Sequence, residues 1–206
     1  MKKFAMFLSV LLIAVTLAAP VSAAVNFNPS VEQKPAPTVD TVTDANGNEV
    51  SAIIRDQDGN ESSAGAIFTE SAYNSTTMED PVTVAYGHQM HAGTMFGKLQ
   101  ETYSQENALE DYGEVIVYLP EKELHYQVFA AVPYDNRHIL YNYDCTDSRR
   151  FNAFLNSIYE VREIGAQFNS GVTVSTGDKV LVLSTCLAGN SQRRYLVLAV
   201  CQAEID

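Results

Sequence analysis

Three polar side chains at the ends of predicted strands have the chemistry of acyl transfer. Cys186 ends one apolar run, Arg194 opens the next, and His88 lies far upstream after a third. A thiolate attacks acyl carbonyls, an imidazole moves protons near neutral pH, and a guanidinium holds a positive charge in a planar fork. Together, these groups could break an acyl bond and hold the acyl group as a thioester.

Cys186 and Arg194 also have plain structural interpretations. A cysteine is among the residue types most often buried, and an arginine beside a strand commonly faces solvent. The short spacing between Cys186 and Arg194 favours the catalytic interpretation. If the two apolar runs are antiparallel neighbours joined by Leu187–Arg193, then Arg194 returns toward Cys186. The guanidinium would then hold a substrate carbonyl or a tetrahedral oxyanion.

The chain has four histidines, and three of them compete with His88. His91 lies close to it in sequence, His125 alternates within a predicted strand and is expected to face solvent, and His138 lies in a polar, tyrosine-rich segment. His88 is preferred because the end of a strand suits an acid or base at the mouth of a site. No Cys-x-x-Cys or His-Glu-x-x-His spacing occurs, so no metal and no cofactor are expected.

Length and charge restrict the class of protein. The chain has 206 residues, of which 46% are hydrophobic, and this suffices for one domain with a core. Its formal net charge is -12, from 13 basic and 25 acidic residues. Nucleic-acid binding needs clustered lysine and arginine, so no nucleic-acid partner is expected.

The N-terminus has the pattern of an export signal. Lys2 and Lys3 precede the apolar run Phe4–Ala19, and small residues follow, with cleavage expected after Ala23. The run is short of the roughly 20 residues that span a membrane. Residues 1–23 are therefore interpreted as a signal peptide, with an uncleaved membrane anchor as the alternative. Either interpretation places the rest of the chain outside the cytoplasm, at the cell envelope.

Export makes the three cysteines informative. An odd number leaves at least one free thiol within a single chain. Cys145 and Cys201 could form a disulfide and leave Cys186 reactive. The favoured alternative is that Cys201 is a buried small hydrophobe within a strand and that Cys145 has no special role.

The remaining chain divides into three parts. Residues 24–40 are rich in proline and indicate a linker. Residues 41–62 form a polar segment that resembles a hairpin, with a turn signal at Asn46-Gly47. Residues 63–206 form the globular domain. It is expected to be mainly β, a barrel or closed sheet, with strands at 64–68, 82–86, 114–119, 124–132, 179–184 and 195–200 and helices at 94–103 and 147–164.

The motifs of this domain resemble those of class B sortases. The segment Tyr86-Gly-His-Gln-Met-His-Ala-Gly-Thr-Met-Phe-Gly-Lys-Leu99 is similar to their catalytic-histidine segment. Leu183-Ser-Thr-Cys186 resembles their cysteine strand, and Arg194-Tyr-Leu-Val resembles the start of their last strand. Ala64-Gly-Ala-Ile-Phe68 resembles the strand ahead of the histidine. The pieces occur in the family's order, and the helix at 147–164 stands where class B members carry one before the cysteine strand.

The resemblance implies a sortase β-barrel with a short helix after the histidine segment and a longer helix before the cysteine strand. It implies a cysteine transpeptidase of the cell envelope with His88, Cys186 and Arg194 as catalytic residues. Thr185, Ser184 and Tyr86 would help bind the substrate. The implied partners are surface proteins that bear a sorting signal, together with an amine on a peptidoglycan precursor or a pilin lysine, close to the membrane. The alternative is a non-catalytic or truncated sortase-like protein that binds peptide or a partner.

The resemblance covers residues 63–200, and the part before it departs from the family. Class B members carry N-terminal helices and two further strands there, whereas this chain has the proline-rich linker and the Asn46-Gly47 segment. Without those strands the barrel would stay open. Residues 41–55 could replace them, another chain could donate them, or the domain is a shortened remnant.

Overall fold

The computed structural model describes residues 42–43, 49–50, 58, 60, 62 and 64–206. The predicted signal peptide, the linker and the Asn46-Gly47 turn lie outside these residues. The helices and strands are β1 Val42–Thr43, β2 Glu49–Val50, β3 Phe68–Thr69, β4 Val82–Tyr86, α1 Leu99–Tyr103, α2 Ala108–Asp111, β5 Glu114–Tyr118, β6 Glu123–Tyr134, α3 Ile139–Asn142, α4 Ser148–Tyr159, β7 Gln167–Phe168, β8 Val180–Leu187 and β9 Asn190–Ile205.

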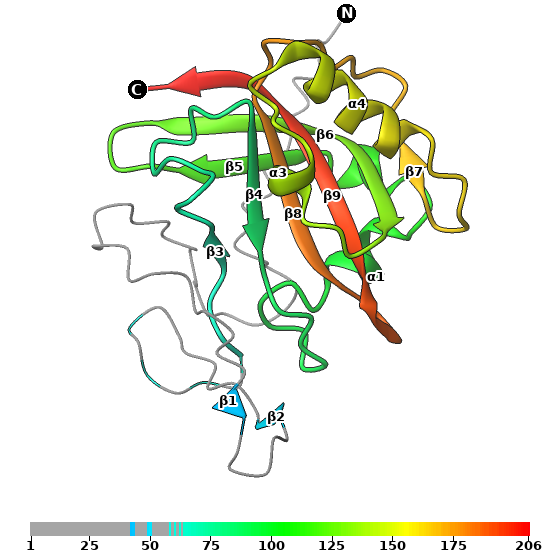
Figure 1. The fold of residues 1–206 in the computed structure, drawn as a ribbon. Helices are drawn as coiled ribbons and strands as arrows, with labels where there is room; N and C mark the ends of the chain where they lie inside the picture. The colour runs from blue at the N-terminus through cyan, green and yellow to red at the C-terminus, as the bar shows by residue number, and fades with distance from the viewer. Residues whose placement is uncertain (1–41, 44–48, 51–57, 59, 61, 63) are drawn as a thin grey trace, which may run out of the picture.

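A mixed sheet of seven strands forms the body of the protein (Figure 1). The strand order is β3-β4-β8-β9-β6-β5, and β7 pairs with β6 beside β5. β4 and β8 run parallel, and every other neighbouring pair in this sheet is antiparallel. β6 and β9 are the longest strands, with 12 and 16 residues, and they pair along most of their lengths. The prediction of a mainly β fold is confirmed.

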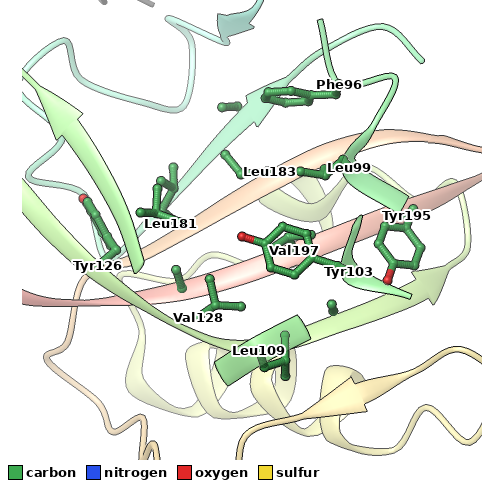
Figure 2. Close-up of a cluster of buried hydrophobic side chains, with 14 of the residues drawn as sticks. Phe96, Leu99, Tyr103, Leu109, Tyr126, Val128, Leu181, Leu183, Tyr195 and Val197 are labelled. Atoms are coloured by element: carbon green, nitrogen blue, oxygen red, sulfur yellow. The ribbon is translucent and has the colours of Figure 1, made fainter. Parts of the chain in front are cut away.

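The central strands are buried on both faces, which explains why they are nearly continuous apolar runs. Odd-numbered residues of β9, such as Tyr195 and Val197, pack with α1 and α2 in one cluster (Figure 2). Even-numbered residues, such as Leu196 and Leu198, pack with α3 and α4 in a second cluster. Successive side chains of a strand point to opposite faces, so this alternation defines an α1 face and an α4 face of the sheet.

The α4 helix forms largely as its apolar spacing predicts. Its buried residues share one side and belong to the second cluster: Phe151, Phe154, Leu155 and Ile158. The Asp147 carboxylate accepts hydrogen bonds from the backbone N–H of Arg149 and Arg150, at 3.0 and 3.1 Å, and caps the N-terminus. The helix ends at Tyr159 rather than at the predicted Ile164. Ile164 is fully exposed, so continuing the helix as far as this residue would gain no burial of its side chain.

Several predicted boundaries were wrong, each for a local reason. The predicted helix 94–103 begins only at Leu99, because Met95 turns back to form a bridge with Gln89. The predicted loop Leu187–Arg193 is a tight turn instead. Gly189, with φ of +78°, makes the turn possible, so that β8 ends only at Leu187 and β9 already begins at Asn190.

The predicted strand 64–68 is reduced to Phe68–Thr69, and β6 does not stop at Pro133. It runs on to Tyr134 because β9 still pairs with it there. On the other side of β6 the pairing with β7 ends at Ala131, so no strand pairs with β6 at Pro133 on that side. A proline, which has no backbone N–H, is tolerated at such a position.

The sheet is open, which corrects the expectation of a closed barrel. In the part of the chain that the structure describes, β3 forms one edge, and β5 and the short β7 form the other. β1 and β2 pair with each other, Val42 opposite Val50, in a separate two-stranded sheet. Closure needs further strands to join β3 to β5, and β1 and β2 do not join either edge.

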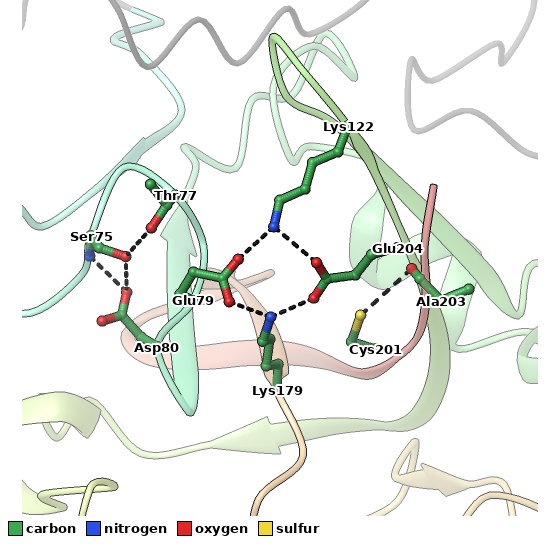
Figure 3. A network of polar contacts seen from close by, with 9 residues as sticks. All are labelled: Ser75, Thr77, Glu79, Asp80, Lys122, Lys179, Cys201, Ala203 and Glu204. Carbon is green, nitrogen blue, oxygen red and sulfur yellow. Dashed lines mark hydrogen bonds and ion pairs between the residues drawn. The ribbon is translucent and has the colours of Figure 1, made fainter. Parts of the chain in front are cut away.

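A ring of four alternating charges joins segments that are distant in sequence (Figure 3). Lys122 lies 2.5 Å from Glu79 and 2.9 Å from Glu204, and Lys179 contacts both carboxylates. The side chains come from the segment before β4, the β5–β6 turn, the residue before β8 and the end of β9. The ring therefore ties together one end of the sheet.

The ring gives a pH-dependent contribution to stability. Hydrogen bonds from Lys179 and Lys122 lower the pKa of Glu204 from 4.5 to about 2. The folded state therefore binds fewer protons than the unfolded state at mildly acidic pH, so the stabilisation is complete above pH 4.5 and is lost as the pH falls toward 2. Because Glu204 is 37% exposed, salt screens part of the effect.

We expect Glu204→Gln to lower the melting temperature by a few degrees at pH 7 and to have no effect near pH 2. Thermal unfolding of both proteins across this range measures the difference. Glu110→Gln is the matched control, since Glu110 is exposed and has no ion pair among the described residues. A Glu204→Gln difference that stays constant with pH would contradict the assignment of this stabilisation to the ionised carboxylate.

Candidate active site

The β8–β9 hairpin brings Cys186 and Arg194 together. The two residues are direct partners across the antiparallel pair, and Arg194 Nη1 lies 3.8 Å from Cys186 Sγ. The same nitrogen donates to the carbonyl oxygens of Ser191 and Arg193, at 2.9 and 3.1 Å. These bonds hold the guanidinium against the thiol. The predicted return of Arg194 toward Cys186 is confirmed.

The pair lies on the α4 face of the sheet. In β8, the even-numbered Val180 and Val182 pack with α4, and Cys186 continues their series. Cys186 is half-buried, whereas the residues of β8 before it are buried. The thiol therefore stands where the strand leaves the core, at a position that solvent and a ligand can reach.

β4 delivers His88 to the same edge of the sheet. It runs parallel to β8 with Tyr86 opposite Ser184, and the Gly87 N–H donates to the Ser184 carbonyl at 3.0 Å. Parallel strands have their carboxyl ends at one edge, so His88 and Cys186 each follow this pair by a few residues. His88 is exposed.

Phe96 explains why a glycine precedes His88. The Phe96 ring is buried over Gly87, and a Cβ at Gly87 would lie 2.4 Å from a ring carbon. The Phe96 N–H also donates to the His88 carbonyl at 3.1 Å. The segment after His88 therefore folds back over the end of β4 and fixes the backbone that carries the imidazole.

Asn74 supports β4 from its outer side. This buried side chain donates to the Val82 carbonyl at 2.8 Å and accepts from the Val84 N–H at 3.0 Å. β3 pairs with β4 only at Tyr86 and Ala85, so the Asn74 amide takes the place of a strand along the first half of β4. This partner was missed in the sequence, because a single asparagine in a polar segment gives no signal of what it will contact.

Tyr86 lies on the α4 face beside the arginine. Its ring stacks on Phe68, with 5.4 Å between the centroids. Burial raises the pKa of Tyr86, the Glu70 carboxylate adds to the rise, and the Arg194 guanidinium opposes it. The phenol therefore stays protonated and can donate a hydrogen bond near Arg194, as a substrate-binding residue would.

Ser184 and Thr185 are less accessible than a role in substrate binding requires. Ser184 is 3% and Thr185 is 2% exposed. Thr185 stands opposite Tyr195, on the α1 face and away from Cys186. The hydroxyls of Thr185 and Tyr195 are buried without a hydrogen-bond partner among the described residues. The substrate-binding role of Thr185 stays a prediction, and its burial argues against direct contact with a peptide.

Two of the other histidines have carboxylate partners, and the third is exposed. His125 alternates with buried neighbours as predicted and is half-buried, and its two ring nitrogens lie 3.1 and 3.3 Å from the carboxylates of Glu114 and Glu123. His138 accepts from the Tyr141 N–H at the start of α3, and its other ring nitrogen lies 2.6 Å from Glu70. His91 is exposed.

The cysteines follow the favoured alternative in being unpaired, but Cys201 is less buried than predicted. All three are free, Cys145 is buried and Cys201 is half-buried, so the possible Cys145–Cys201 disulfide is absent. Burial raises the pKa of the Cys145 thiol to about 12, and it also raises the pKa of Cys201. Both thiols are therefore poor nucleophiles at neutral pH.

Gln100 of α1 is a further supporting residue that the sequence did not reveal. Its side-chain oxygen accepts from the Ala188 N–H at 2.8 Å and so holds the turn that follows Cys186. A glutamine on a helix surface is common and carries no pattern that would indicate this contact.

Among the described residues, no helix has the length and apolarity that crossing a bilayer requires.

Comparison with known proteins agrees with this geometry. A family model described as a sortase domain matches residues 44–202, so the chain belongs to the sortase family. A search of curated proteins finds no match. Among solved structures, sortase B from the type II pilus of Streptococcus pneumoniae is 25% identical, with a TM-score of 0.56 over 67% of this chain and 76% of that one.

Two further structures share the fold. A class B sortase of Streptococcus pyogenes involved in pilus biogenesis is 24% identical, with a TM-score of 0.61 over 73% of this chain and 78% of that one. Sortase B of Bacillus anthracis in complex with AAEK2 is also 24% identical, with a TM-score of 0.58 over 72% and 65% of the two chains. The family domain and these neighbours support a transpeptidase of the sortase type.

Proposed function

We propose that the protein is a class B-like sortase, a cysteine transpeptidase that cleaves a C-terminal sorting signal after threonine. It then joins the threonine to an amine of a peptidoglycan precursor or a pilin. The observation that carries the proposal is the 3.8 Å contact of Arg194 Nη1 with Cys186 Sγ, beside the strand end that leads to His88. The predicted export signal supports a location for this reaction at the cell envelope, close to the membrane.

The first half of the reaction forms a thioester. The Cys186 thiol gives its proton to His88, its sulfur attacks the threonine carbonyl carbon, and the carbonyl oxygen becomes an oxyanion on a tetrahedral carbon. The guanidinium of Arg194, already at the thiol, stabilises this developing charge or holds the peptide backbone. When the C–N bond breaks, His88 gives a proton to the departing amine, and the threonine acyl group remains on sulfur.

The second half transfers the acyl group. An incoming amine attacks the thioester carbonyl carbon and loses one proton to His88. The C–S bond breaks, a new amide forms, and Cys186 is released as it began. The phenol of Tyr86 beside Arg194 offers a hydrogen bond to the signal peptide throughout.

Detection of the acyl-enzyme tests the proposal. The purified protein would be mixed with a panel of fluorogenic peptides of Leu-Pro-x-Thr-Gly and Asn-Pro-x-Thr type and followed by intact-protein mass spectrometry. We expect a mass increase equal to the peptide fragment that ends in threonine, and its removal by hydroxylamine. Absence of both adduct and cleavage from folded protein would reject the enzyme.

The open sheet favours a second candidate, a sortase-like protein that binds peptide or a partner without catalysis. Within the described residues, β3 and β5 have no outer neighbours, and an enzyme site on an incomplete sheet could lack rigidity. This candidate predicts saturable binding of a sorting peptide with no adduct on Cys186. The same mass measurement, run beside a fluorescence-anisotropy titration, separates the two.

A further inference from the structure

A cavity of about 600 Å³ has Arg193, the residue before Arg194, in its lining. Its walls are the end of β6, the segment between β6 and α3, the second half of α4 and its exit, and Arg193 of β9. In the sheet, β4 stands on one side of the β8–β9 hairpin and β6 on the other. The cavity thus approaches the hairpin from the side opposite His88.

The cavity is close enough to the thiol to serve the same reaction. Tyr134 lines it and stands opposite Arg194, which in turn stands opposite Cys186. Neighbouring strands lie about 4.8 Å apart, so the backbone of Tyr134, two strands away, is roughly 10 Å from the backbone of Cys186. A lysine side chain or a short peptide seated there can extend an amine to an acyl group on Cys186.

The charges in the cavity leave one carboxylate without an ionic partner. Arg137 Nε donates to both Asp135 oxygens at 2.8 Å. Arg193 donates to both oxygens of Glu163, at 2.6 and 2.5 Å. Glu160, the third carboxylate of the lining, is exposed and has no ion pair among residues 64–206.

The two paired carboxylates are committed to their arginines. Arg137 holds the pKa of Asp135 below its usual range, and Arg193 does the same for Glu163. Both pairs are therefore fixed charges that define the walls. Glu160 stands at the C-terminus of α4, where the helix dipole also favours a cation.

Polar groups for a peptide chain surround this charge. The Tyr134 hydroxyl and the Ser157 hydroxyl lie 2.7 Å apart, and Arg137 Nη1 donates to the Tyr143 hydroxyl at 2.9 Å. Asn156 also lines the cavity. Amide and hydroxyl groups of this kind match the backbone of a short peptide and add orientation to the attraction of Glu160.

We propose that this cavity binds the acceptor of the transfer reaction, a peptide or lysine side chain that carries a primary ammonium, with Glu160 as its charge partner. The inference rests on the proposed function and assigns the second substrate to its own site. The sorting signal enters from the β4 side, near Tyr86, and the acceptor enters from the β6 side. The ammonium leaves Glu160 and gives one proton to water, and its nitrogen then attacks the thioester carbonyl as described above.

The test separates acceptor binding from acyl-enzyme chemistry. Transfer of the acyl group to triglycine amide, which carries one ammonium and no carboxylate, would be measured for the native protein and for Glu160→Gln. We expect the apparent KM for this amine to rise about fivefold, the size of one partly exposed ion pair, and to lose its dependence on ionic strength. The transfer rate to hydroxylamine, which is neutral and needs no charge partner, should stay within about twofold.

Glu121→Gln is the matched control, because Glu121 is exposed in the β5–β6 turn, outside the cavity lining. It should leave both rates unchanged. If the acyl-enzyme forms and Glu160→Gln leaves the KM for triglycine amide unchanged, the acceptor site is refuted while the proposed function stands. If no acyl-enzyme forms in the native protein, the proposed function is rejected, and the acceptor site falls with it.

Discussion

Replacement of Cys186 by alanine is expected to abolish cleavage of the sorting peptide, with a loss of at least ~10³-fold in kcat. The reason is that the sulfur is the nucleophile of the proposed mechanism, and an alanine side chain has no atom that can hold the acyl group. The Arg194 guanidinium contacts the thiol, but it stays protonated and so cannot replace the sulfur as a nucleophile. Fluorogenic cleavage and intact mass measure the loss of turnover and of the adduct together.

The control for this variant is Cys201→Ala. Cys201 of β9 is also a half-buried cysteine. Its thiol lies 3.7 Å from the Ala203 carbonyl oxygen, at the end of the sheet that carries the charge ring (Figure 3). Its removal should leave cleavage unchanged. Cleavage that persists in folded Cys186→Ala would mean that another residue is the nucleophile and that the proposed mechanism is wrong.

Replacement of Arg194 by alanine is expected to lower kcat/KM by about 10²- to 10³-fold, the loss that follows removal of one oxyanion donor. Arg194 contacts the sulfur before substrate arrives and is held by two backbone carbonyls, so its charge is already oriented when the oxyanion develops. Arg194→Lys should recover only part of the activity, because an ammonium lacks the planar fork of a guanidinium. Steady-state cleavage without added amine measures both variants.

Arg149→Ala is the control for loss of a positive charge, since the Arg149 side chain is 95% exposed on α4. It should retain full activity. If Arg194→Ala retained activity within about twofold while Cys186→Ala was inactive, Arg194 would be a structural residue of the hairpin. Equal activity of Arg194→Lys and the native protein would instead mean that charge alone suffices.

Much of the central fold could be predicted because periodicity reports burial. β4, β5 and the core of β8 and β9 are runs of apolar residues that the sheet buries, and the spacing of Phe151, Phe154 and Ile158 forms a helix. The boundaries were harder, because they depend on contacts that are remote in sequence. Pro133 stays in β6 only because β9 pairs beside it, and the helix after His88 starts late because Met95 bridges to Gln89.

The candidate site was predictable where strand pairing is local. Cys186 and Arg194 flank one short turn, so antiparallel pairing brings them together. The site's supports were not predictable. Asn74, Gln100 and Phe96 act through the backbone of β4, of the turn and of the His88 segment, and none belongs to a residue pattern with a fixed spacing. Glu160 was likewise not predictable as a site residue, because the cavity that it lines is formed by tertiary packing.

The two strand pairings that assemble the site differ in how far apart along the chain their partners lie. The β8–β9 hairpin closes a short loop, and it can place Arg194 against Cys186 at a small cost in chain entropy. The β4–β8 pairing joins Tyr86 to Ser184 only after the intervening strands and α4 have been accommodated. The contact between the thiol and the guanidinium is thus local in sequence. The β4–β8 pairing that positions His88 joins residues that are far apart in sequence. Folding would therefore bring the guanidinium to the thiol early and His88 to the same end of the sheet late, so the three side chains proposed for catalysis come together only when β4 has paired with β8.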